Sequence, residues 1–127
     1  MNKLAAIAVT TALLVPGLGR AQDAMQYHVK HLKVLAEDDK VRVLDWAPKQ
    51  GDKTPMHSHP ATVAYVVKGC KVHYLFPDGT SKDAEIKTGD AVIRPPVTHA
   101  DEALGDCEVI LVELKAGVPA PPAVRAN

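Results

Sequence analysis

Residues 51–59 read GDKTPMHSH, a stretch that places two imidazoles two positions apart. A Gly/Pro segment that favours a turn precedes them, and the β-prone run Val63–Lys68 follows. In an extended chain alternate side chains share a face, so His57 and His59 are expected to point the same way. Two neutral imidazoles on one face supply half of a transition-metal site. The stretch therefore predicts a kind of chemistry but says little about a substrate.

Short β-prone runs and turns alternate along the rest of the chain. No window of about twelve residues beyond residue 21 shows a convincing helical period of apolar side chains. Turn signals recur about every eight to twelve residues, which is typical of a closed barrel or a double-sheet jelly roll. The segment 48–55 is expected to be a loop that delivers the two histidines. Strands are expected at 29–35, 41–46, 63–67, 71–76, 84–87, 91–94, 99–103 and 108–114.

Two motifs in this order resemble those of the cupin superfamily. Residues 51–59, followed by YVVKG at 65–69, are similar to its first motif, and GDAVIRPPVTH at 89–99 is similar to its second. With the turn PDG at 77–79 between them, the similarity extends from about residue 41 to residue 113. It implies an all-β chain with one cupin-type double-stranded β-helix, that is, a jelly-roll barrel.

The resemblance implies that His57, His59 and His99 are metal ligands inside the barrel. Three nitrogens on one side of an ion leave its other positions open. The superfamily pattern has a glutamate three residues before Tyr65, but Thr62, a poor ligand, stands there. Two residues are candidates for an additional metal ligand or for a side chain that contacts the ligands. They are Thr62 and Asp101, a carboxylate two residues after His99. The alternative is a set of surface histidines that binds no metal.

A site of three histidines without a carboxylate keeps a charge near that of the bare divalent ion, which favours an anionic ligand. Arg94, near the mouth of the barrel, is a candidate partner for such a ligand, although an ordinary surface arginine is the alternative. Candidate pocket walls are Tyr65, Tyr74 and Trp46, with plain core packing as the alternative. No residue stands out as a general base, so no catalytic residue is assigned.

The resemblance permits a metal-dependent dioxygenase that acts on a small organic acid, thiol or phenol. Fe(II) is the favoured cofactor, with Zn, Mn, Ni and Cu as alternatives. The rival function is a non-catalytic, metal-containing module that binds a small ligand. A metal-free barrel used as an isomerase or a lectin-like binder is a third reading, because one fold supports many functions.

The first 21 residues differ in character from the rest. Lys3 begins a cationic region, residues 4–15 are apolar, and Gly19 and Ala21 provide the small residues of a cleavage site. The apolar run is short for a bilayer span, which favours a cleaved signal peptide over an anchor or a buried helix. We therefore expect a signal peptide over 1–21, a cupin domain over 22–115 and a Pro-rich disordered tail over 116–127. The protein is expected to be periplasmic or secreted.

Charge excludes some partners of the exported chain. Of 15 basic residues, loss of Lys3 and Arg20 leaves 13, against 15 acidic residues. This near-neutral balance is not typical of nucleic-acid binding, and no basic amphipathic helix suggests membrane binding after cleavage. The expected partners are a small-molecule ligand and a second copy, because strand 29–35 would otherwise leave an open sheet edge. A sedimentation mass of one chain would refute the homodimer.

Cys70 and Cys107 are the two cysteines of the chain. In an oxidising compartment such a pair is a disulfide candidate, and its spacing excludes a CxxC redox motif. The strand order that the resemblance implies brings both residues near the same end of the barrel. A Cys70–Cys107 disulfide and two free buried thiols are both left open.

Overall fold

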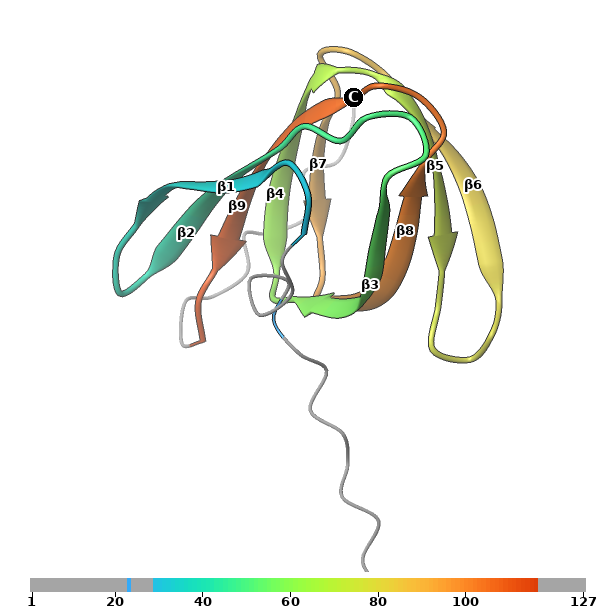
Figure 1. The fold of residues 1–127 in the computed structure, drawn as a ribbon. Coiled ribbons are helices and arrows are strands. Elements are labelled where there is room, and N and C mark those ends of the chain that lie inside the picture. Colours follow the sequence, from blue (N-terminus) through green and yellow to red (C-terminus); the bar gives the residue numbers. More distant parts are fainter. Residues whose placement is uncertain (1–22, 24–28, 117–127) are drawn as a thin grey trace, which may run out of the picture.

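The computed structural model describes residue 23 and residues 29–116 (Figure 1). These residues form strands, turns and loops without a helix, so the predicted all-β class is confirmed. The predicted signal peptide and residues 117–127 of the predicted tail lie outside the described part. The strands are β1 (Leu32–Glu37), β2 (Val41–Trp46), β3 (Lys53–His59), β4 (Thr62–Lys68), β5 (Cys70–Leu75), β6 (Ser81–Ile86), β7 (Ala91–Arg94), β8 (Val97–Ala103) and β9 (Glu108–Leu114).

Within the described part of the chain, no helix is long and apolar enough to cross a membrane.

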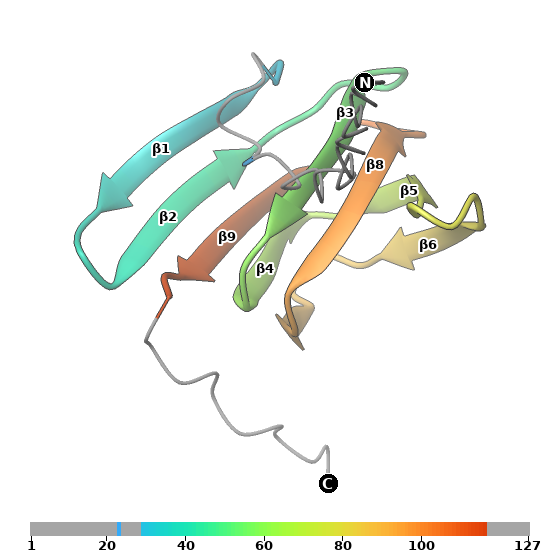
Figure 2. The same cartoon turned by 90° about the horizontal axis from the view of Figure 1, so that it is seen from below.

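The strands form two antiparallel sheets. One sheet has the order β1-β2-β9-β4-β7, and the other has the order β3-β8-β5-β6. Figure 1 shows the larger sheet on the left and the smaller one on the right, joined at the bottom where β3 runs into β4. Figure 2 shows β3 and β8 side by side, with β1 at the far edge of the larger sheet. Because sheet neighbours come from distant parts of the sequence, the topology is that of the predicted jelly roll.

The core lies between the sheets and consists mainly of small apolar side chains. Alternate residues of each strand face inward, so Ala64 and Val66 of β4 meet Val72 of β5 and Val109 of β9. Val72 and Ala103 are completely buried. Because alanine and valine fill little volume, this core leaves room for a cavity beside it.

The expected loop over 48–55 is wrong in its last three residues. Strand β3 already begins at Lys53, and the pairing of β3 with β8 is irregular between Thr54 and His57. Pro55 lies inside this irregularity, where the missing backbone N–H costs no regular ladder hydrogen bond. The two histidines therefore lie on a strand rather than at the end of a loop.

A disulfide joins Cys70, the first residue of β5, to Cys107 in the loop before β9, with the Cα atoms 5.4 Å apart. Strand β5 belongs to the smaller sheet and β9 to the larger one. The disulfide therefore links the two sheets at one end of the molecule.

Candidate metal centre

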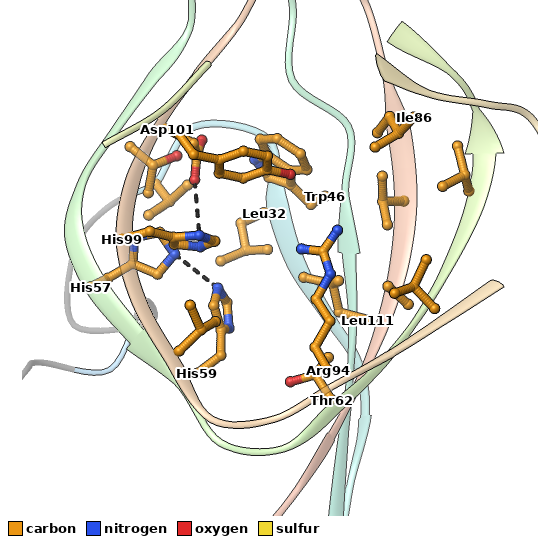
Figure 3. Close-up of a pocket in the computed structure, with 18 of the residues that line it drawn as sticks. Leu32, Trp46, His57, His59, Thr62, Ile86, Arg94, His99, Asp101 and Leu111 are labelled. Carbon is orange, nitrogen blue, oxygen red and sulfur yellow. Dashed lines mark hydrogen bonds and ion pairs between the residues drawn. The ribbon is translucent and has the colours of Figure 1, made fainter. Parts of the chain in front are cut away.

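Two paired strands bring the three predicted ligands together. His57 and His59 lie on β3 and His99 lies on β8, and the antiparallel register places His57 directly opposite His99. Directly opposed residues share a face of the sheet, so all three rings point into the space between the sheets (Figure 3). The ring centroids lie 4.6 Å (His57–His59), 4.8 Å (His57–His99) and 5.4 Å (His59–His99) apart.

Hydrogen bonds fix the tautomers of two of the rings. His57 Nδ1 donates to the Pro55 carbonyl at 2.8 Å, and His59 Nδ1 donates to Glu113 Oε1 at 2.6 Å. A carbonyl and a carboxylate accept hydrogen bonds, so each Nδ1 carries a proton, and in a neutral ring the Nε2 atom keeps a lone pair. The two Nε2 atoms nevertheless lie only 2.8 Å apart (dashed in Figure 3). In neutral rings no hydrogen lies between them, so two lone pairs face one another where a cation would be stabilised.

Two of the three rings, His57 and His99, favour the neutral form that binds a metal. Burial lowers the pKa of His57. Burial, and next the neighbouring His57 and His59, lower the pKa of His99 to about 3. Because protons compete with metal ions for imidazole nitrogens, His57 and His99 are uncharged at neutral pH and available as ligands.

The donor set fits a divalent transition metal. One nitrogen from each histidine lies within 4.8 Å of the other two. Ligands at about 2.1 Å from one ion can be at most about 4.2 Å apart, so the rings would close slightly around it. Three imidazoles suit Zn, Cu, Fe and Ni better than Mg or Ca, which prefer oxygen ligands.

Neither candidate additional ligand joins the three nitrogens. Asp101 Oδ2 lies 4.0 Å from His99 Nε2, and Asp101 does not belong to the cluster of converging donor atoms. Burial raises the pKa of Asp101 to about 6, and its Oδ1 has no hydrogen-bond partner among the described residues. The Thr62 hydroxyl donates to the Pro60 carbonyl at 2.8 Å. Both side chains line the cavity beside the histidines.

The rings open into a cavity of about 70 Å³. Tyr74 stacks on His99, with ring centroids 5.2 Å apart and planes at 15°. Arg94 Cζ lies 6.0 Å from the Tyr74 centroid, and Figure 3 shows its guanidinium pointing inward. The other lining residues are Val29, Leu32, Trp46, Thr54, Thr62, Ala64, Val66, Ile86, Asp90, Val92, Val97, Asp101, Val109 and Leu111.

The expectation that Tyr65 forms a pocket wall is wrong. Its side chain is 51% exposed and does not line the cavity. Ala64 and Val66, its neighbours on β4, point into the core, so the period-two alternation directs Tyr65 to the outer face.

Glu113 and Arg42 are two residues of this region that the sequence reasoning missed. Glu113 on β9 is 1% exposed and accepts the hydrogen bond from His59. Its Oε2 lies 3.1 Å from Arg42 Nε, an ion pair whose angle falls outside hydrogen-bond geometry. A signal was present in the sequence: Val109, Leu111 and Glu113 share one face of the final strand, and the acid interrupts an apolar inner face.

Comparison with known proteins establishes the fold. No family model matches the chain, and no curated protein matches it. A cupin domain from Bordetella pertussis Tohama I is similar in structure, with a TM-score of 0.61 and 22% identity over 67% of this chain and 92% of its own. A cupin-like protein from Thermotoga maritima MSB8 has a TM-score of 0.52 and 27% identity, over 67% of this chain and 68% of its own.

An RmlC-like cupin protein from Desulfovibrio desulfuricans is similar over 84% of this chain and 97% of its own. Its identity to this chain is 17% and the TM-score is 0.51. The fold is thus that of small, one-barrel cupin structures, and the predicted cupin-type jelly roll is confirmed. On this fold, the chain has a three-histidine group that could hold a metal ion.

Proposed function

We propose that this protein is an exported cupin that holds a divalent transition metal through His57, His59 and His99 and oxidises a small organic acid as a dioxygenase. One observation carries the metal: the Nε2 atoms of His57 and His59 converge to 2.8 Å, while the Nδ1 atom on the other side of each ring is engaged with an acceptor. Fe(II) is the metal proposed, because three protein ligands leave positions for both O2 and substrate.

The cavity supports a small anionic ligand. A volume of about 70 Å³ has room for roughly half a dozen water-sized atoms. Arg94 lines this cavity, and no carboxylate among the described residues forms an ion pair with it. An inward guanidinium without a protein counterion favours a carboxylate as its ligand. The organic acid is therefore preferred here to the thiol and the phenol, which remain arms of the test.

The side chains have separable roles in this proposal. When bound, the metal supplies Lewis acidity and, as iron, a redox centre. The three imidazoles hold it, Arg94 orients the carboxylate of the ligand, and apolar side chains such as Leu111 and Val109 keep water away from the centre. No proton transfer is assigned to a side chain in this proposal.

A non-catalytic, metal-containing binding module is the second candidate. The observation that favours it is the lack of a carboxylate among the converging donor atoms, since Asp101 Oδ2 lies 4.0 Å from His99. Such a module would use the same histidines and the same Arg94 to capture a ligand without turnover.

Metal analysis of protein prepared without added metal tests the proposal first. We expect about one metal ion per chain in the wild type and a near-complete loss in His57→Ala. His73→Ala is the matched control, because His73 lies 40% exposed on the outer face of β5 and pairs with Asp83. A wild type that carries and binds no metal would favour the metal-free barrel instead.

Oxygen uptake of the Fe(II)-loaded protein separates the two candidates. Small carboxylic acids, thiols and catechols are supplied in turn, and uptake is expected with an acid. Arg94→Met should raise KM for that acid at least about tenfold, because it removes a charge-assisted hydrogen bond. No uptake across the panel, with stoichiometric iron bound, would leave the binding module as the function.

Export is part of the same proposal. The link between Cys70 and Cys107 supports it, because structural disulfides persist in oxidising compartments such as the periplasm. Protein recovered from the periplasmic fraction of a bacterial host with Gln22 as its first residue would agree with cleavage after Ala21. Uncleaved protein confined to the cytoplasm would contradict it.

A further inference from the structure

We infer that Glu113 is a positioning residue of the metal centre: it orients His59 through Nδ1 and supplies the negative charge that three neutral imidazoles lack. The inference deepens the proposed function and rests on it for the metal. It follows from a chain of contacts that runs from the centre through β9 and β2 to Asp23.

The first contact lies at the ligand itself. His59 Nδ1 donates to Glu113 Oε1 at 2.6 Å, a short, charge-assisted hydrogen bond. This bond places the proton on Nδ1, directs the lone pair of Nε2 toward His57 and raises the basicity of the ring as a ligand. The His57 ring is held by a weaker hydrogen bond, because its Nδ1 donates only to a neutral backbone carbonyl.

The second contact holds the carboxylate in place. An unpaired carboxylate that is 1% exposed would be very costly to bury, but Arg42 Nε lies 3.1 Å from Glu113 Oε2. Asp23 in turn accepts two hydrogen bonds from Arg42, at 2.7 Å and 3.2 Å. Carboxylate, guanidinium and carboxylate thus alternate from the surface to the histidine, which leaves Glu113 little freedom to turn away.

The strand register explains why this acid can replace the missing one. In the ladder between β4 and β9, Glu113 lies directly opposite Thr62. Thr62 occupies the place where the superfamily pattern has a glutamate, and its hydroxyl donates to the Pro60 carbonyl. Opposite residues share a face, so the neighbouring strand delivers a carboxylate to the same region of the interior. Its charge then reaches the ion through His59 instead of by direct ligation.

Glu113→Gln tests the inference, and Glu102→Gln is its matched control. Glu102 lies on β8, the strand that carries His99, and pairs with Lys53 at 3.2 Å, so the control removes the same charge from this strand without an ion pair to any of the three ligands. Zn²⁺ affinity is measured by competition with a chelator on folded, metal-stripped protein. We expect a loss of about 10- to 100-fold for Glu113→Gln and less than about 3-fold for Glu102→Gln.

A second measurement reads the tautomer of His59 without any metal. Imidazole ¹⁵N chemical shifts of the metal-free wild type should show Nδ1–H for His59, and Glu113→Gln should mix in the Nε2–H form. If Glu113 only stabilises the fold, the variant unfolds more easily but keeps both the Zn²⁺ affinity and the tautomer, which would overturn the inference. Should the variant not fold, an Nε2–H His59 in the wild type would overturn it equally.

The two proposals fail in different ways. A wild type that binds no Zn²⁺ and no Fe(II) refutes the metal centre itself. If Glu113→Gln binds Zn²⁺ as tightly as the wild type does, only the role of Glu113 is refuted.

Discussion

The His99 ring is shielded from water by Tyr74 on one side and by two other imidazoles nearby. It stacks on Tyr74 at 5.2 Å, and its centroid lies 4.8 Å from that of His57. Burial and the neighbouring imidazoles disfavour its charged form and lower its pKa to about 3. The resemblance of its motif predicted this residue as a ligand, but its shielding depends on Tyr74, which comes from the adjacent strand β5.

The low pKa of His99 predicts an acid-sensitive metal-free protein. Because the folded-state pKa lies below the ordinary value of 6.5, the unfolded chain binds more protons between about pH 6.5 and pH 3. The stability that neutral His99 contributes is therefore full above pH 6.5 and is lost as pH falls toward 3. Urea unfolding in EDTA at pH 7 and pH 4.5 should show this loss, and His99→Gln should reduce its size. An NMR titration midpoint of His99 above pH 6 would contradict the prediction.

At the scale of elements, the alternation of side chains along the strands and the residues at the turns decide most of the strand positions and buried faces. The Gly69 turn between β4 and β5 packs closely: a Cβ on Gly69 would lie 2.5 Å from the Ile86 carbonyl oxygen and 2.8 Å from the Thr88 nitrogen. Glycine is required here by the close approach of backbone. The turn was expected from the sequence, but its close approach to the backbone of Ile86 and Thr88 could not be predicted from the sequence.

Gly69→Ala is expected to lower the free energy of unfolding by about 1–3 kcal/mol, because backbone atoms must move to admit the methyl group. Gly105→Ala is the control, since its Cβ would lie 3.4 Å from Cys70 Cβ, where a small adjustment suffices. Chemical denaturation of both variants checks the difference. Equal stability of the two would show that the turn has more room than the structure indicates.

At the scale of the whole molecule, one covalent link and one open edge stand out. The disulfide links the smaller sheet to the loop that precedes the last strand of the larger sheet. Strand β1 ends the larger sheet, and its Leu35 is 55% exposed. An exposed edge strand is a surface on which another chain can pair. The homodimer stays a prediction, to be decided by the sedimentation mass.

Loss of the disulfide should destabilise the protein without removing the metal site. The link spans 37 residues of sequence, and closing such a loop stabilises a fold by about 3–4 kcal/mol on the chain-entropy model. We expect Cys70→Ser/Cys107→Ser to lower the free energy of unfolding by this amount, as measured in urea. The folded fraction should keep its Zn²⁺ stoichiometry, because the ligands lie on β3 and β8. A loss below about 1 kcal/mol would contradict the entropic account.

The sequence by itself determined the all-β class and the positions of most strands along the chain, because periodicity and turn residues are local properties. The three histidines followed from the resemblance of its two motifs to those of the cupin superfamily. The sequence also showed that Thr62 stands in place of the glutamate of the superfamily pattern, but it could not show which residue compensates for the missing carboxylate. Only the tertiary structure decided that β9 lies beside β4, that Glu113 meets His59, and that Tyr65 faces outward while Tyr74 covers His99. The physical reason is register: which side chains of distant strands oppose one another depends on how the strands pair, and one residue of slip would reverse every face.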